Sequence, residues 1–245
     1  MYNFITKSPT IHEIIKGLEL TKELFVSSII IGEAHTGKKG LINHLFSSSL
    51  PRVSAYNQTE LEDFLNHYDE LIITDFEQIT NTHQYNFNNK KIIATANYIT
   101  NQNSIDDIFA FIYNMPSLKE REEDIEYLSQ LFLKEASSTL MVEKDVDISD
   151  LKLDLSQNTK SLKKSIYRYV VIKSIQEEEI RESIYHFLYK NMGGNNAYKE
   201  YLELYEKPII EAGLKKYHSQ LKLSSILGIN RNTLRKKILE HKIDV

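Results

Sequence analysis

Two glycines and a lysine near the N-terminus have the spacing of a loop that binds phosphate. Gly32 and Gly37 enclose four residues and Lys38 follows them, which gives the pattern Gly-x-x-x-x-Gly-Lys. The apolar run 26–31 predicts a buried strand before the loop, and apolar residues at helical spacing from Leu41 onward predict a helix after it. In that context backbone amides and the helix N-terminus can hold phosphate oxygens, with the lysine ammonium on the terminal ones. A glycine-rich turn without a ligand is the alternative.

Polar side chains end two further strand patterns. The run 70–75 ends in Asp75, as the metal-bearing strand of such sites does, and the run 91–97 ends in Asn97. The usual Ser or Thr ligand for Mg²⁺ is replaced by Lys39, so the match to the loop pattern is incomplete. We expect ATP or ADP as the cofactor, with Mg²⁺ held indirectly by Asp75. The predicted nucleotide-binding residues are Gly32, Glu33, Thr36, Gly37, Lys38, Lys39 and Asp75.

The segment 219–238 has the pattern of two short helices joined by a tight turn. Gly228 suits the left-handed conformation that ends a helix, and Asn230 suits the N-cap of the next one. This pattern predicts a helix-turn-helix, whose second helix enters the major groove of DNA. Apolar residues at helical spacing should face a small core; they are Leu223, Ile226, Leu227, Leu234 and Ile238.

The second of these helices leaves polar and basic side chains on its outer face. Arg231 is the candidate for reading a guanine, because an arginine can donate two hydrogen bonds to that base. Lys237 is expected to contact a phosphate, so its loss should weaken binding to every sequence. A solvated basic helix without a DNA role is the alternative. The predicted DNA-binding residues are Gln220, Asn230, Arg231, Asn232, Thr233, Arg235, Lys236 and Lys237.

Composition excludes several classes of function. The chain has 245 residues, 41% hydrophobic and 26% charged, which fits a globular protein of two or three compact units. It lacks cysteine, so disulfides and thiolate catalysis are excluded, and its eight histidines show no metal-ligand spacing. No Ser-His-Asp or paired-carboxylate pattern is present, so no catalytic residue is predicted. No apolar run approaches a membrane span and no leader pattern opens the chain, so we expect a cytoplasmic protein.

Charge is distributed unevenly along the chain. From Leu214 onward eight basic residues face two acidic ones, so this tail carries +6, and the rest carries −10 of the net −4. An acidic body with a basic tail is typical of a protein that binds DNA through that tail.

The tail resembles the DNA-binding end of the nucleoid protein Fis and of the NtrC-type bacterial enhancer-binding proteins. The run 227–237, Leu-Gly-Ile-Asn-Arg-Asn-Thr-Leu-Arg-Lys-Lys, carries the resemblance. Leu221 departs from it, since the family usually has a Ser or Thr there that can bond a phosphate. The order of the three strand patterns and the segment 115–125, Met-Pro-Ser-Leu-Lys-Glu-Arg-Glu-Glu-Asp-Ile, resemble the AAA+ domain of the same activators.

Departures from that family bear on activity. Asp75 is followed by Phe76 instead of the glutamate that polarises water, and Glu77 would lie on the opposite face if the strand continued. His35 replaces a loop glycine, the segment 105–111 contains none of the family's arginine fingers, and Lys160 replaces the arginine of the second sensor. Loss of one such arginine alone lowers turnover about 10³–10⁵-fold. Efficient ATP hydrolysis is therefore not expected, and the chain is not predicted to be an enzyme.

A deletion bears on partners. Only 36 positions separate Lys39 from Asp75, and no Gly-Ala-Phe-Thr-Gly-Ala string occurs. The resemblance implies that this string grips the alternative sigma factor, so we expect that contact to be lost.

The predicted fold is an α/β P-loop (AAA+-like) core with a helical lid, followed by an all-α Fis-type helix-turn-helix domain. The expected boundaries are 1–113 for the core with three to five parallel strands, 114–192 for the lid, and 197–245 for the DNA-binding domain. Residues 51–66 are expected to form a surface connection and a short helix. The lid should carry one apolar stripe, formed by Leu162, Ile166, Val170 and Ile175.

The predicted function is a sequence-specific DNA-binding transcriptional regulator that forms a homodimer. Ile209, Ile210 and Leu214 are candidates for the dimer seam, unless they cover the helix-turn-helix itself. Two rival hypotheses remain open. In one, ATP or ADP switches the assembly that binds DNA; in the other, the chain is an interaction module that inhibits a full-length relative by mixed assembly.

Overall fold

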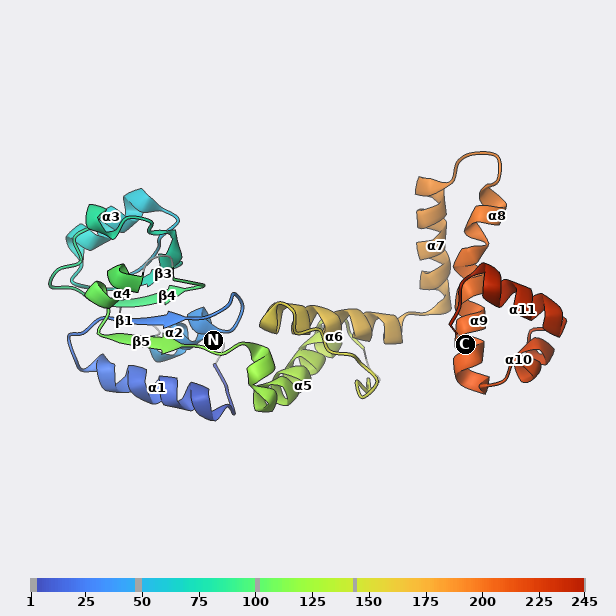
Figure 1. The fold of residues 1–245 in the computed structure, drawn as a ribbon, viewed down its shortest axis with the longest axis horizontal. Helices are drawn as coiled ribbons and strands as arrows, with labels where there is room; N and C mark the ends of the chain where they lie inside the picture. The colour runs from blue at the N-terminus through green and yellow to red at the C-terminus, as the bar shows by residue number, and fades with distance from the viewer. Residues whose placement is uncertain (1–3, 47–49, 100–101, 143–144, 245) are drawn as a thin grey trace. The chain divides into compact units, whose positions relative to one another are not determined.

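The computed structural model describes residues 4–46, 50–99, 102–142 and 145–244 of the chain (Figure 1). The chain divides into two compact units, Met1–Ser174 and Ile175–Val245. The division differs from the expected one, which placed residues 114–192 together.

The first unit is built on a sheet of five parallel strands. Their order is β2-β3-β4-β1-β5, which confirms the expected parallel core. The two strands at the edges of the sheet were not predicted: one has only three residues, and the other, Phe-Ile-Tyr-Asn, was missed although its first three residues are apolar. The strands are β1 (Ser28–Ile31), β2 (Arg52–Ser54), β3 (Glu70–Thr74), β4 (Lys91–Ala96) and β5 (Phe111–Asn114).

Helices cover both faces of this sheet (Figure 1). Helices α1 (Pro9–Lys22) and α2 (Lys38–Leu45) pack with Ile30 on one face, and α3 (Gln58–His67) and α4 (Gln102–Ile108) pack with Ile29 on the other. Since each central strand is buried on both faces, most of its residues are apolar. Because the strands are parallel, the carboxyl ends of β1, β3 and β4 lie along the same side of the sheet, where ligands bind in such sheets.

A helical lid completes the first unit. It consists of a short turn η3 (Leu118–Glu120), then α5 (Glu122–Thr139) and α6 (Asn158–Ser174). Leu162, Ile166 and Val170 are fully buried against α5. Ile175, the fourth residue of the expected stripe, lies beyond the end of α6, so that part of the prediction is wrong.

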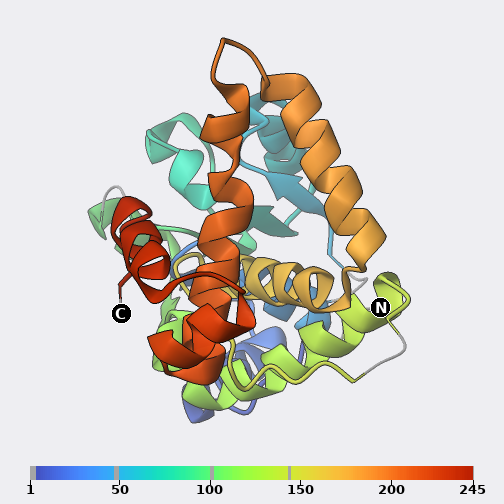
Figure 2. The ribbon, with the colours of Figure 1, turned by 90° about the vertical axis from the view of Figure 1, so that its right-hand side faces the viewer.

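The second unit contains only helices among its described residues. Helix α7 (Glu177–Asn191) runs beside α8 (Ala197–Tyr201) and the start of α9 (Glu203–Tyr217), as Figure 2 shows. The Phe187 and Tyr201 rings meet edge to face at 6.1 Å, and the Tyr201 hydroxyl donates to the Asn191 carbonyl at 2.6 Å. The expected linker at 192–196 is thus the loop of a helical hairpin. None of the helices among the described residues is long and apolar enough to span a membrane.

Helices α10 (Gln220–Ile226) and α11 (Arg231–Glu240) pack on α9 around a separate small core. Ile210 is 1% exposed in this core, and the partly buried Ile209 and Leu214 pack against it, so these three residues do cover the helix-turn-helix. Ile226 is 50% exposed, which corrects its expected burial. The core consists of Ile210, Leu223, Leu234, Ile238 and Ile243.

Candidate nucleotide and DNA sites

The loop between β1 and α2 has the backbone geometry that a phosphate-binding loop needs. Gly37 has φ of 106°, in the left-handed region that favours glycine. At Gly32 an added Cβ would lie 2.4 Å from the carbonyl oxygen of Met115, so only glycine allows this approach. His35 adopts φ of 62° without being glycine. The Thr36 hydroxyl donates to the Glu33 carbonyl at 2.9 Å and closes the loop on itself.

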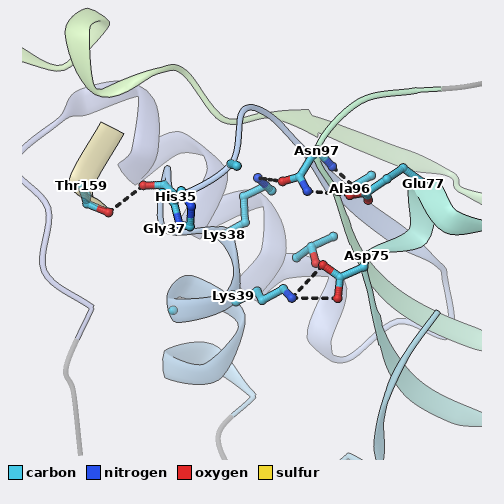
Figure 3. Close-up of a pocket in the computed structure, with 12 residues that line it drawn as sticks. His35, Gly37, Lys38, Lys39, Asp75, Glu77, Ala96, Asn97 and Thr159 are labelled. Atoms are coloured by element: carbon cyan, nitrogen blue, oxygen red, sulfur yellow. Dashed lines mark hydrogen bonds and ion pairs between the residues drawn. The ribbon is translucent and has the colours of Figure 1, made fainter. Parts of the chain in front are cut away.

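A cavity of about 290 Å³ opens at this loop (Figure 3). Four of the seven predicted nucleotide-binding residues line it, namely Gly37, Lys38, Lys39 and Asp75. The other three, Gly32, Glu33 and Thr36, belong to the loop but are not among the lining residues. Asn97, the polar residue at the end of the third strand pattern, also lines the cavity. Three further lining residues were not predicted for this site; these are Glu77, Thr95 and Thr159.

The ammonium of Lys38 is already hydrogen-bonded by the protein. Its Nζ donates to the carbonyl oxygens of Gly32 and Glu33, each at 2.7 Å, and to Oδ1 of Asn97 at 3.1 Å. Burial lowers the pKa of Lys38 to about 8, against the opposing charge of Glu77. The cavity therefore holds a cation whose burial favours contact with an anionic ligand.

Glu77 lies in the cavity, which corrects the expectation that it faces away. The strand ends at Thr74, Asp75 takes φ of 59°, and the next residues form a short 3₁₀ turn, η1 (Phe76–Gln78). This turn brings Glu77 to the same side as Asp75. Its two carboxylate oxygens accept from Asn97, at 2.6 Å from the side-chain nitrogen and 3.1 Å from the backbone nitrogen.

Asp75 is held by three donors, and Figure 3 shows the first of them, Lys39. The Nζ of Lys39 lies 2.7 Å from Oδ1 and 2.8 Å from Oδ2, and the Ser54 and Thr74 hydroxyls donate to Oδ2 at 3.0 and 3.1 Å. Burial opposes ionisation, but the Lys39 and Ser54 hydrogen bonds outweigh it and hold the pKa of Asp75 below its ordinary value. The Asp75 carboxylate, which was expected to support Mg²⁺, is thus already paired with the Lys39 ammonium. These residues therefore do not fit Mg²⁺.

Thr95 presents a hydroxyl that can serve a ligand. Thr95 lies on β4, is 1% exposed and lines the cavity. Within the described part of the chain its Oγ1 has no hydrogen-bond partner. Because buried polar groups are almost always paired, this hydroxyl points to a ligand or an ordered water in the cavity.

The lid is tied to the loop by hydrogen bonds. Asn158 donates to Oε2 of Glu33 and to the carbonyl of Ala34, both at 3.0 Å, and the Thr159 hydroxyl donates to the carbonyl of His35 at 2.7 Å. The start of α6, where the second sensor was expected, therefore rests on the phosphate loop.

A buried ion pair between Arg121 and Asp124 also contacts the phosphate-binding loop. Nη2 of Arg121 donates to the Thr36 carbonyl at 2.8 Å, and its Nη1 lies 3.4 Å from Oδ2 of Asp124. Asp124 also accepts from the Thr6 hydroxyl and from the Lys7 backbone nitrogen, at 2.8 and 2.6 Å. The segment 115–125 thus joins the N-terminal segment, the loop and the lid.

We expect phosphate binding to depend on pH through Lys38. A phosphate bonds the ammonium form, so raising the pH above about 8 deprotonates the free site and weakens binding. Between pH 7 and pH 9 the affinity for ADP should fall about tenfold, with proton uptake on binding near pH 8. Titration calorimetry in two buffers of different ionisation enthalpy measures both quantities. A constant affinity over this range would contradict the assignment.

In the second unit the predicted DNA-binding residues lie around the start of α11. The side chain of Asn230 accepts from the Asn232 nitrogen at 2.8 Å, which confirms the expected N-cap, and Gly228 has the expected positive φ of 65°. Gln220 is half-buried at the start of α10. The exposed members of the set are Asn230, Arg231, Asn232, Thr233, Arg235 and Lys236.

Lys237 differs from the rest of the predicted DNA-binding set. Its ammonium forms an ion pair with Glu206 of α9, and Nε2 of His241 lies 3.1 Å from the other oxygen of that carboxylate. Hydrogen bonding from Lys237, more than the opposing burial, holds the pKa of Glu206 below its ordinary value. The partner lies 31 residues away in sequence, so no local pattern revealed this pair.

Comparisons with known proteins agree with both parts of the fold. Residues 201–241 match the family model described as bacterial regulatory protein, Fis family. No curated protein matches the sequence. Over its whole length the chain resembles crystal structures of NtrX from Brucella abortus. The ATP complex has a TM-score of 0.57 at 13% identity, covering 99% of this chain and 70% of that one. The ADP complex has a TM-score of 0.56 at 12% identity, covering 98% and 69%.

The fold and the comparisons define the class. The first unit has a parallel α/β core that resembles those of AAA+ P-loop proteins in fold, and the C-terminal helical region carries a Fis-type helix-turn-helix.

Proposed function

We propose that the chain is a sequence-specific DNA-binding transcriptional regulator of the cytoplasm whose AAA+ core binds a nucleotide without hydrolysing it efficiently. The exposed basic start of α11 in a Fis-type helix-turn-helix is the observation that carries the proposal. Arg231 is the residue for base readout, and the neighbouring polar and basic residues hold phosphates and fix the register.

Nucleotide binding is supported by the cavity and by its lining. The loop geometry, the buried ammonium of Lys38 and the unpaired Thr95 hydroxyl all suit phosphate oxygens. The NtrX structures of similar fold hold ATP and ADP.

Efficient hydrolysis is disfavoured by the same lining. Asp75 is paired with Lys39, and Glu77 has both oxygens engaged by Asn97 instead of being free to orient water. The segment 105–111 supplies no arginine to stabilise the transition state.

We include a homodimer in the proposal. None of the residues of α7 is buried, although Ile180, Ile184 and Phe187 recur at helical spacing and are 41–48% exposed. A second copy of this helix would cover such a stripe. Two helix-turn-helix units could then read half-sites about one helical turn apart. The sigma-factor contact is not included, because the chain lacks the string that would make it.

Fluorescence anisotropy of labelled AT-rich duplexes, with and without ATP, tests this proposal. We expect salt-dependent binding by two chains per duplex, with a steep fall in affinity as salt rises. If the affinity for DNA is the same with and without ATP, nucleotide does not regulate DNA binding. If the affinity for DNA changes several-fold with ATP, nucleotide switches DNA binding. No binding to any duplex would overturn the proposed function and favour an interaction module that inhibits a relative.

A further inference from the structure

The first turn of α2 places a positive charge where P-loop sites place a metal ligand. The residue after the loop lysine is ordinarily a Ser or Thr whose hydroxyl binds Mg²⁺. Here that residue is Lys39, and its Nζ lies 2.7 and 2.8 Å from the two carboxylate oxygens of Asp75. Asp75 follows β3 directly, at the position of the acidic residue that supports the metal in such sites.

A lysine cannot replace the hydroxyl as a metal ligand. An ammonium has three donors and no acceptor, and its charge repels a divalent cation. The acceptors of Asp75 are also satisfied without a metal, since Ser54 and Thr74 donate to the same carboxylate. The Lys39 ammonium already provides the positive charge that Mg²⁺ would place beside Asp75.

We propose that the cavity binds the phosphates of a nucleoside diphosphate or triphosphate without a divalent metal, with the Lys39 ammonium as a tethered cation. The Lys39 side chain is 56% exposed while that of Asp75 is 12% exposed. With two of its three donors on the Asp75 oxygens, the ammonium has one donor left for a phosphate oxygen. Lys38 supplies a second positive charge, and the Thr95 hydroxyl supplies an unused donor. The inference rests on the nucleotide-binding part of the proposed function and specifies its ligand.

Calorimetric titration with ADP tests the inference in EDTA and in excess Mg²⁺. We expect the wild-type chain to bind ADP with about the same affinity in both buffers. Lys39→Ser restores a hydroxyl ligand and removes the ammonium. It should weaken ADP binding in EDTA about tenfold to a hundredfold, the range for losing a hydrogen bond between charged groups, and Mg²⁺ should restore it.

Two further variants separate charge from folding. Lys39→Arg keeps the positive charge and should still bind ADP in EDTA. Lys16→Ser removes an exposed lysine from α1, away from the cavity lining, and should leave both affinities unchanged. The thermal unfolding midpoint of each variant shows that it is folded.

Several results would overturn the inference. They are a wild-type chain that needs Mg²⁺ for ADP, a Lys39→Ser variant that binds as tightly as wild type in EDTA, and no ADP binding in either buffer. DNA binding measured by anisotropy on the same preparation keeps the two proposals distinct. ADP binding that requires Mg²⁺ refutes only the inference. Absence of ADP binding with DNA binding intact refutes the inference together with the nucleotide-binding part of the proposed function, whereas metal-free ADP binding without DNA binding refutes only the regulatory part.

Discussion

Replacing Arg231 with alanine should remove most of the preference for the selected DNA site while leaving much of the nonspecific affinity. Arg231 is the first residue of α11, after the Asn230 cap, and is exposed there. Helix-turn-helix proteins present this end of the helix to base edges. A bidentate arginine–guanine contact contributes about 1–3 kcal/mol of discrimination, so the ratio of specific to nonspecific affinity should fall about tenfold to a hundredfold.

The measurement compares dissociation constants for a selected duplex and a scrambled one at the same salt concentration. Lys236→Ala is the matched control, because Lys236 is exposed on the same helix and its Nζ is 3.7 Å from Glu240. It should weaken both duplexes alike and reduce the salt slope by about one unit. An equal loss on both duplexes with Arg231→Ala would contradict its base-reading role.

Replacing Asp124 with alanine should destabilise the first unit by about 3–5 kcal/mol, the cost of leaving a buried charge without its partner. Both Arg121 and Asp124 have side chains only 2% exposed. The substitution would leave the Arg121 guanidinium buried and would also remove the acceptor of Thr6 and Lys7. The loss should lower the urea midpoint of unfolding followed by circular dichroism.

Glu122→Ala is the control for this effect. Glu122 precedes Asp124 by two residues at the start of α5 but is exposed, so its replacement should change stability by no more than about 0.5 kcal/mol. A cost below about 1 kcal/mol for Asp124→Ala would show that the buried pair does not hold the lid and the loop together.

The parts of the fold that were predictable from sequence are those with local or continuous signals. β1, β3 and β4 each contain a run of apolar residues because both faces of each strand are buried. Gly228 and Asn230 each fix a local turn or cap, so the helix-turn-helix was predictable from neighbouring residues. The edge strand β2 has only three residues, and β5 was missed although its first three residues are apolar. The boundary at Ser174 depends on packing that sequence does not show.

The candidate site was predictable only where a motif is contiguous. The loop spacing singled out Gly37 and Lys38, and both residues line the cavity. The place of Glu77 depends on the left-handed backbone of Asp75, which turns the chain where a continued strand was expected. The Lys237–Glu206 pair joins two helices far apart in sequence and could not be inferred from the charge pattern alone.

The three protein acceptors that hold Lys38 are expected to limit the rate at which a ligand binds, in addition to its affinity. An incoming phosphate must take the ammonium from the Gly32 or Glu33 carbonyl or from Asn97 before it is fully bound. If the cavity binds nucleotide as proposed, we expect association to proceed by a rapid encounter followed by a slower exchange of partners. The observed rate should level off as ligand concentration rises, at a ceiling set by the loop instead of by diffusion.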